Sequence, residues 1–291
     1  MKYFTRSLFL LLFIPFQLLA QQVSEPSDLV LSTKFYNAEN KWITFPKLPT
    51  DTVYSYGFLY IDQMAGFTFD FKGTFKVGKD AKLLPRPNPS NASMKYRLEA
   101  NTRDVAVLSA TRLAELGLTV EPDWLKTYKV DPKLLPTMVA WGKHYNHVGA
   151  YEKALEYLLP AYAKDPHYRG LEFELSYAYN ASLQFEKAIL VLNAAIAASP
   201  KDFWFFRELG YAYMASKKTL EAEAAYLKAL EYCTVQKDKT EIAYNMAFMY
   251  FKLSNKQKFA EWHDKTKSFS PDESSQFLMN LNGMSEKLED K

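Results

Sequence analysis

The histidines at positions 144 and 147 have a spacing that could serve a metal ion. They stand three residues apart, so on a helix both rings would point to one side. No third ligand lies beside them at a helical interval, and a zinc site needs three or four ligands. We therefore predict that both histidines are polar surface residues of a helix and that the protein holds no metal or other cofactor.

The residues that could act as a nucleophile or a general base are equally isolated. The single cysteine, Cys233, has no histidine or aspartate pattern near it, and one cysteine excludes both a disulfide framework and a cysteine-based zinc site. Glu221 and Glu223 flank Ala222, so we expect them to lie on different sides of a helix and to be solvated. Phosphate-loop, G-x-S-x-G and H-E-x-x-H motifs are missing. The sequence predicts a protein that is not an enzyme.

The composition is that of a folded chain with many aromatic rings. The 291 residues are 48% hydrophobic and 24% charged, which is ordinary for a globular protein. Phenylalanine, tyrosine and tryptophan make up 16% of the chain. The formal charge is only +3 and no basic run of five residues occurs, which argues against nucleic acid as a partner.

The first twenty residues have the pattern of a secretory signal peptide. Lys2 and Arg6 precede the apolar run Leu8–Phe16, and the small residue Ala20 precedes two glutamines. Pro15 interrupts the apolar run, which is shorter than the ~20 residues that span a bilayer.

We therefore predict cleavage after Ala20, export, and no membrane span in the mature chain, with peripheral association with the envelope still allowed. An uncleaved anchor is the alternative. The junction resembles the export signals of Bacteroidota-type bacteria, which implies a periplasmic location.

A fixed period of 34 residues runs through the middle of the chain. Tyr145, Tyr179 and Tyr213 are separated by that interval. The same interval relates three further sets of residues: Ala154, Ala188 and Ala222; Ala161, Ala195 and Ala229; Pro132, Pro166 and Pro200. Self-similarity at a period of this length indicates an array of stacked supersecondary units.

The residues at these positions resemble the tetratricopeptide repeat (TPR) pattern W-x2-L-G-x2-Y, A-x3-F, P. The first unit reads Met138-x2-Trp141-Gly142-x2-Tyr145, Ala154-x3-Leu158, Pro166. The second reads Glu172-x2-Leu175-Ser176-x2-Tyr179, Ala188-x3-Leu192, Pro200, and the third reads Phe206-x2-Leu209-Gly210-x2-Tyr213, Ala222-x3-Tyr226, with Thr234 in place of proline. The small residues Gly142, Ser176 and Gly210 are expected where two helices approach closely.

The resemblance implies a mainly α protein, a TPR α-solenoid of helix–turn–helix repeats. We predict repeats at 135–168, 169–202 and 203–236, a degenerate fourth repeat at 237–271, a capping helix at 272–291, and a helical cap or degenerate repeat at 101–134. Atypical terminal repeats are expected because their outer faces meet water.

The segment before the repeats has the two-residue period of β-strands. From Phe67 to Val77 apolar residues alternate with polar ones, which predicts a strand with one buried face, and Gly73 indicates a bulge or a close backbone approach. A second strand at Tyr54–Tyr60 and a third near Lys41–Phe45 complete a small β-rich module at 21–83. The proline-rich segment 84–100 is predicted to be an extended linker.

The TPR resemblance also implies a binding face. In this family the first helix of each repeat lines a concave groove, and the corresponding residues here are Val139, Lys143 and Asn146; Phe173, Tyr177 and Asn180; Arg207, Tyr211 and Met214; Tyr244, Phe248 and Phe251. As partner-binding residues we predict Lys143, Asn146, Phe173, Tyr177, Asn180, Arg207, Tyr211, Tyr244 and Phe248. Val139 stands where carboxylate-clamping members carry a lysine, so that ligand is not implied. Phe203 and Phe206 are assigned to the core.

These features favour a non-catalytic interaction scaffold of the cell envelope that binds a protein or peptide in its groove, because aromatic residues and arginine dominate recognition surfaces. A protein that binds glycans or small ligands through exposed aromatic rings is the first alternative. An enzyme whose site lies in the N-terminal module is the second.

Overall fold

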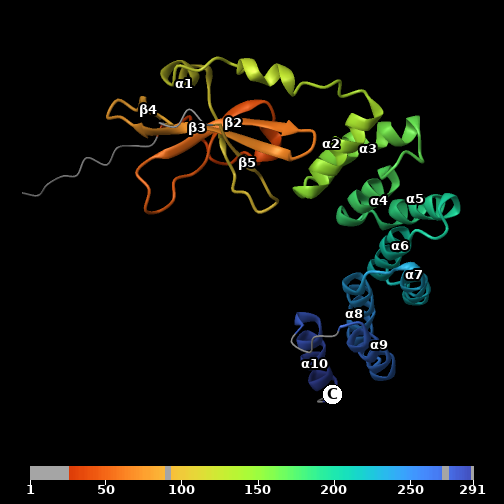
Figure 1. The fold of residues 1–291 in the computed structure, drawn as a ribbon. Helices are drawn as coiled ribbons and strands as arrows, with labels where there is room; N and C mark the ends of the chain where they lie inside the picture. Colours follow the sequence, from red (N-terminus) through yellow and green to blue (C-terminus); the bar gives the residue numbers. More distant parts are fainter. Residues whose placement is uncertain (1–25, 89–92, 271–274, 290–291) are drawn as a thin grey trace, which may run out of the picture.

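The computed structural model describes residues 26–88, 93–270 and 275–289. A β-sheet near the start of the chain is followed by helices packed in pairs, and the two parts are in contact at the first pair (Figure 1). The predicted signal peptide lies outside the described residues. Within them, no helix combines the length and the apolar character needed to cross a membrane.

The sheet is antiparallel and is built around one long hairpin. Its strands are β1 (Lys41–Thr44), β2 (Tyr54–Asp62), β3 (Gly66–Val77), β4 (Leu83–Pro87), β5 (Met94–Arg97) and β6 (Ala106–Val107). Their order is β4-β3-β2-β1-β6, with β5 also pairing with β3. Asp62 closes the β2–β3 turn, because its Oδ1 accepts hydrogen bonds from the amides of Met64 and Ala65, each at 2.9 Å. The three strands predicted from the sequence are all present.

A bulge in β3 sends its aromatic side chains to both faces of the sheet. Tyr56 pairs with Gly73 and Gly57 with Phe71, so Lys72 is the extra residue. Phe69, before the bulge, therefore belongs to the core shared with the helices, whereas Phe75, after it, belongs to a second core on the other face. The bulge expected near Gly73 is confirmed. The expectation of a single buried face is wrong.

The proline-rich segment is not a free linker, which corrects the prediction for 84–100. Strand β4 pairs with the second half of β3 and β5 with the first half. Pro85 and Pro87 are compatible with β4 because it is an edge strand, where a missing amide proton costs no ladder hydrogen bond on the outer side. Gly73 allows this pairing, since a Cβ there would lie 2.7 Å from the Arg86 carbonyl oxygen.

Residues 101–134 cover the sheet and form no repeat, which corrects a second prediction. This segment contains β6, the short helix α1 (Ala110–Glu115) and the 3-10 helix η2 (Asp123–Thr127). Leu113, Leu116 and Leu125 pack in the second core with residues of β2. The apolar residues of the segment are therefore used on the sheet and are not available for a helix pair.

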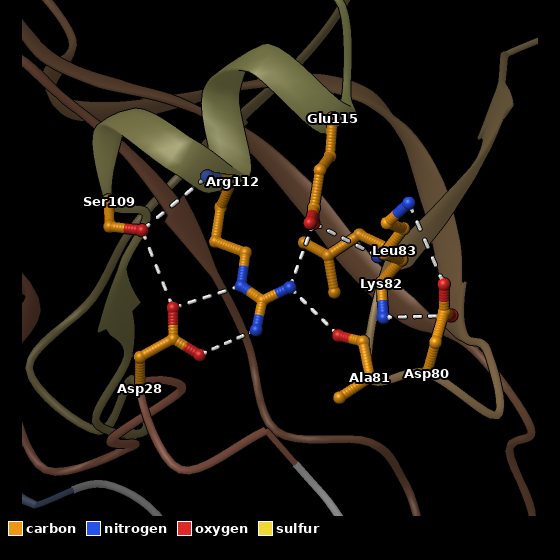
Figure 2. A network of polar contacts seen from close by, with 8 residues as sticks. All are labelled: Asp28, Asp80, Ala81, Lys82, Leu83, Ser109, Arg112 and Glu115. Carbon is orange, nitrogen blue, oxygen red and sulfur yellow. Dashed lines mark hydrogen bonds and ion pairs between the residues drawn. The ribbon is translucent and has the colours of Figure 1, made fainter.

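A network around Arg112 fastens α1 to two distant parts of the chain (Figure 2). Its guanidinium donates to both carboxylate oxygens of Asp28, at 2.9 and 2.8 Å, and to the Ala81 carbonyl oxygen at 2.8 Å. Glu115 accepts from Arg112 at 2.8 Å and from the Leu83 amide at 3.0 Å. The Arg112 hydrogen bond holds the pKa of Asp28 below its usual value. The network therefore ties α1 to β4 and to the segment around Asp28.

Helix pairs follow at the predicted intervals. They are α2 (Leu135–His147) and α3 (Tyr151–Lys164); α4 (Leu171–Ala181) and α5 (Phe185–Ala198); α6 (Phe203–Ala215) and α7 (Thr219–Tyr232); α8 (Gln236–Lys252) and α9 (Lys256–Phe269). Helix α10 (Gln276–Glu289) packs against α8 and α9. Figure 1 shows the pairs leading away from the sheet one after another.

The small residues of the repeat pattern lie at the close approaches within the pairs. A Cβ on Gly142 would lie 2.4 Å from the side chain of Leu158 in α3, and one on Gly210 would lie 2.6 Å from the ring of Tyr226 in α7. Ser176 in α4 is fully buried. Gly142 and Gly210 therefore lie at close contacts between two helices, as the 34-residue period predicts for them.

The sheet and α2 share one hydrophobic core. Phe67 in β3 meets Tyr145 edge to face, with ring centroids 5.1 Å apart. The Tyr145 hydroxyl donates to Glu39 Oε2 at 2.9 Å, and His144 Nε2 lies 2.9 Å from the Gln63 carbonyl oxygen. We call this contact the sheet–α2 junction. It makes the β-rich part the cover of the first repeat.

Both histidines whose spacing could serve a metal ion, His144 and His147, contact the β-rich part instead. His144 is buried, and its burial lowers the pKa of its ring below the usual value. His147 is half-exposed and lies 2.6 Å from Glu99 Oε2 and 3.0 Å from the guanidinium of Arg97. The prediction of two surface residues is therefore wrong for His144. Among residues that the structure describes, no group of three or more potential metal ligands occurs.

Candidate functional site

A hollow of about 420 Å³ opens where the first helices of three successive pairs, α4, α6 and α8, face the same side. The residues that line it are Tyr151, Tyr177, Asn180, Ala181, Arg207, Glu208, Tyr211, Tyr226, Glu241 and Asn245. Four of the predicted partner-binding residues, Tyr177, Asn180, Arg207 and Tyr211, are brought together here. We call it the α4–α6–α8 hollow.

Asn180 joins two repeats at the edge of this hollow. Its amide nitrogen donates to the backbone carbonyl and to the Oε2 of Glu208 in α6, each at 3.2 Å. Both neighbours are acceptors, which fixes the orientation of the amide. Asn180 is only 2% exposed, and its Oδ1 has no hydrogen-bond partner within the described part of the chain.

Asn146 repeats this arrangement one unit earlier. Its amide nitrogen donates to the carbonyl oxygen and to the Oε2 of Glu174 in α4, each at 2.9 Å. Desolvation raises the pKa of Glu174, and the Asn146 hydrogen bond partly opposes that rise. Both asparagines, predicted as partner-facing, are therefore buried residues that link neighbouring repeats. In each of them the amide oxygen has no hydrogen-bond partner among the described residues and is itself buried.

Arg207 is held at one side of the hollow by two neighbours. Its guanidinium donates to Glu208 Oε1 at 3.0 Å and lies 4.4 Å from the centre of the Trp204 ring. Stacking on the indole and pairing with a carboxylate both satisfy the positive charge. Trp204 is 38% exposed, and its ring meets that of Phe173 edge to face, with ring centroids 5.8 Å apart. Arg207 is thus neutralised within the protein.

Tyrosine rings form the walls and the floor. Tyr177 is half-buried, and the centre of its ring lies 6.0 Å from that of Tyr151. Tyr211 is more accessible, at 38% exposed. Desolvation is the largest cause that raises the pKa of Tyr177, and the carboxylates of Glu208 and Glu174 raise it further. Tyr226 is completely buried at the floor, and its hydroxyl makes no hydrogen bond of good geometry to a described residue.

The remaining predicted residues lie outside the hollow. Lys143 is exposed on α2, and Phe173 stacks on Tyr177 at 6.4 Å. Tyr244 is covered by α10, because its ring lies 5.0 Å from that of Phe277. Phe248, half-buried, stacks on Tyr244 at 6.4 Å. Of the predicted aromatic residues, Tyr211 on α6 is therefore accessible to a partner, whereas Tyr244 on α8 is packed against α10.

Several residues of this surface were not predicted from the sequence. Trp204 lies three positions before Arg207 on α6, and Glu241 lies three positions before Tyr244 on α8. The i, i+3 relation would have placed both on the predicted stripe, had it been extended by one turn toward the helix N-terminus. Tyr151 and Tyr226 belong to second helices, so a search confined to first helices could not find them.

Glu223 is also not the solvated side chain that the sequence suggested. It accepts hydrogen bonds from the hydroxyl of Tyr250 at 2.7 Å, the indole of Trp262 at 2.9 Å and the ammonium of Lys258 at 3.0 Å. These three donors together outweigh its burial and lower its pKa. Glu223 links α7 to α8 and α9, which fits a structural role.

Comparison with known proteins finds helical-repeat structures. No family model and no curated protein matches the chain. The chain is similar to a thermophilic TPR protein of Thermus thermophilus, TTC0263, with 21% identity, a TM-score of 0.44, and coverage of 57% of this chain and 86% of that one.

Two further solved structures are similar over a comparable share of the chain. MamA from Desulfovibrio magneticus RS-1 has 21% identity and a TM-score of 0.44, and covers 53% of this chain and 83% of its own. A TPR protein from Parabacteroides merdae ATCC 43184 has 18% identity and a TM-score of 0.45, and the match covers 54% of this chain and 60% of that one. These similarities to TPR proteins each extend over about half of this chain.

Proposed function

We propose that this protein is an exported, non-catalytic TPR scaffold of the bacterial cell envelope, with its helix pairs arranged as an α-solenoid. Its partner is a protein segment held against α4, α6 and α8. The observation that supports this most is the α4–α6–α8 hollow, which combines exposed and half-buried tyrosine rings with the half-buried carboxylate of Glu241. Such surfaces are typical of recognition sites. The signal-peptide pattern at 1–20 supports a periplasmic location.

The rings beside the hollow are suited to binding because they are already held in place. Trp204 is fixed by Arg207 on its face and by Phe173 at its edge. A ring that does not move on binding loses little conformational entropy, so its buried area contributes more fully to affinity. Trp204 and Tyr211 are each 38% exposed and offer such area.

The size of the site suits a short extended segment. Helix α4 packs on α6, and packed helices lie about 8–10 Å apart, whereas α8, among the preceding helices, packs mainly on α7. An extended chain advances about 3.3 Å per residue, so about three residues cross α4 and α6, and a segment of about six residues extends beyond them toward α8. We propose an extended segment of that length as the element of the partner that the hollow recognises.

Site-specific photo-crosslinking tests this proposal. A photoreactive phenylalanine analogue at position 211 is expected to capture a defined protein in the native cell, because Tyr211 borders the hollow. The matched control is position 190 on α5, where Leu190 is 72% exposed and does not line the hollow. Equal capture at both positions, or none at position 211, would contradict the proposal.

A saccharide is the second candidate ligand, at a different place. A hollow of about 620 Å³ beside β4 and β5 is lined by Trp124 and Tyr128 together with Asp70 and Lys95. Half-buried aromatic rings beside polar groups can stack on sugar rings and bond to hydroxyls. Retention on a glycan array that Trp124→Ala abolishes and Tyr211→Ala leaves unchanged would favour this candidate over the first.

A further inference from the structure

Asn180 is already occupied within the protein and is not offered to a ligand of the α4–α6–α8 hollow. Its nitrogen is engaged by two acceptors of Glu208, and its Oδ1, although unpaired, is buried. A charged group of a ligand therefore has to be met by other residues of the lining.

Glu241 adds a negative charge to the lining that no described cation pairs with. It lines the hollow from α8, is half-buried, and makes no ion pair or hydrogen bond with the described side chains. The other carboxylate of the lining, that of Glu208, is already paired with Arg207 and Asn180. Glu241 is thus the carboxylate in the lining that remains available to a cation.

Tyrosine rings line the same hollow. Tyr177 and Tyr211 line the same hollow from α4 and α6. The faces of aromatic rings attract cations, and a planar guanidinium can stack on them while its edge makes hydrogen bonds. The one cationic group of the lining, Arg207, is turned to Trp204 and Glu208 and leaves this attraction unused.

We propose that the α4–α6–α8 hollow receives an arginine side chain of the partner segment, with its guanidinium paired with Glu241 and stacked on a tyrosine ring of the lining. This inference rests on the proposed function and names the residue that the hollow selects. Arginine fits better than lysine, since its planar guanidinium can stack on an aromatic ring while its edge donates hydrogen bonds to a carboxylate. An acidic side chain would be repelled by Glu241.

A peptide library tests the inference directly. The probes are hexapeptides with a fixed central arginine, and the same peptides with lysine, citrulline or glutamate in that place. Citrulline keeps the shape of arginine and removes its charge. We expect the arginine peptides to bind at least about tenfold more tightly than the citrulline peptides, because a hydrogen-bonded charge pair is lost.

Variants of the protein assign the effect to the hollow. Glu241→Gln removes the charge and keeps the shape, and is expected to bring arginine and citrulline peptides to nearly equal affinity. Glu221→Gln is the matched control, because Glu221 is exposed on α7 and does not line the hollow. The melting temperature of each variant shows whether it is folded.

The outcomes separate this inference from the proposed function. One outcome is that peptides bind the wild type and not Tyr211→Ala, but show no preference for arginine. This outcome would overturn the arginine assignment and leave the α4–α6–α8 hollow as the binding site. A preference for arginine that Glu241→Gln does not change would also overturn it. If no peptide binds and crosslinking at position 211 captures nothing, both proposals are wrong.

Discussion

The sheet–α2 junction and the α4–α6–α8 hollow contain the same kinds of residue, but their polar atoms differ in hydrogen bonding. Both bring tyrosine rings together with a buried or half-buried glutamate. At the junction the polar atoms are paired, since Tyr145 donates to Glu39 and His144 lies against the Gln63 carbonyl oxygen. At the hollow, Asn180 Oδ1 and the Tyr226 hydroxyl lack a hydrogen bond of good geometry in the described structure. The two regions therefore differ in how their polar atoms are hydrogen-bonded and not in residue type.

The largest effect is expected at the junction. Tyr145 is 3% exposed and packs on Phe67, so Tyr145→Ala should lower the free energy of unfolding by about 3–5 kcal/mol, the usual cost of truncating a buried aromatic residue. Denaturant unfolding measures it. Tyr211→Ala, at an exposed ring, is the control and should change stability little. Similar losses in both variants would break the distinction between joint and site.

Overpacking beneath the hollow should cost somewhat less. Gly210→Leu would push against the Tyr226 ring and lower stability by about 1–3 kcal/mol. Gly283→Leu is the matched control, because a Cβ on Gly283 meets nothing within 4 Å. A melting temperature that is unchanged in Gly210→Leu would mean that the repeat register is misplaced.

Truncation at the hollow should act on binding and spare the fold. Once the crosslinked partner is identified, Tyr177→Ala and Tyr211→Ala should each weaken its affinity by about thirtyfold, which corresponds to the ~2 kcal/mol typical of a recognition hot spot. Isothermal titration calorimetry and melting curves, recorded side by side, measure both quantities. Normal binding by the two variants would move the partner site elsewhere. Loss of the fold in either variant would show that its ring is a packing residue.

The smallest effect is a pH dependence confined to the junction. Burial lowers the pKa of His144, with Lys143, Arg97 and His147 adding unfavourable charge, so the unfolded state takes up its proton first as the pH falls. The stability contributed by the neutral ring is present above the unfolded pKa of ~6.5 and is lost below it.

The same junction contains a group, Glu39, whose contribution to stability depends on pH in the opposite direction. Burial raises the pKa of Glu39, so its contribution is present below its unfolded pKa and is lost as the pH rises. Urea unfolding at pH 7 and pH 5, compared between the wild type and His144→Gln, isolates the histidine. A variant that loses as much stability as the wild type on acidification would exclude His144 as the cause.

The repeats could be predicted from the sequence because their determinants are local. The positions of Gly142 and Gly210 follow from helical periodicity within one unit, and the structure places both at close helix contacts. The edge strands were missed because pairing of Pro85 and Pro87 with β3 depends on residues far away in sequence. A proline-rich segment looks alike whether it is a free linker or a sheet edge.

The candidate site was only half predictable for a related reason. The stripe rule placed Tyr177 and Tyr211 correctly on one side of the helices, but it also selected Asn146 and Asn180. Their partners, Glu174 and Glu208, lie 28 residues further along the chain in the next repeat. Periodicity within one helix gives a direction for a side chain and not the neighbour that it meets there.

The contact of the sheet with α2 gives the row of helix pairs a closed end. A helix pair at the end of a stack normally leaves one side ready to accept another pair, whether from the same chain or from a second molecule. Here Phe67 and the Gln63 turn already occupy that side of α2. The array therefore has a direction, because the α2 end is closed to a further helix pair and to head-to-tail addition of a second molecule.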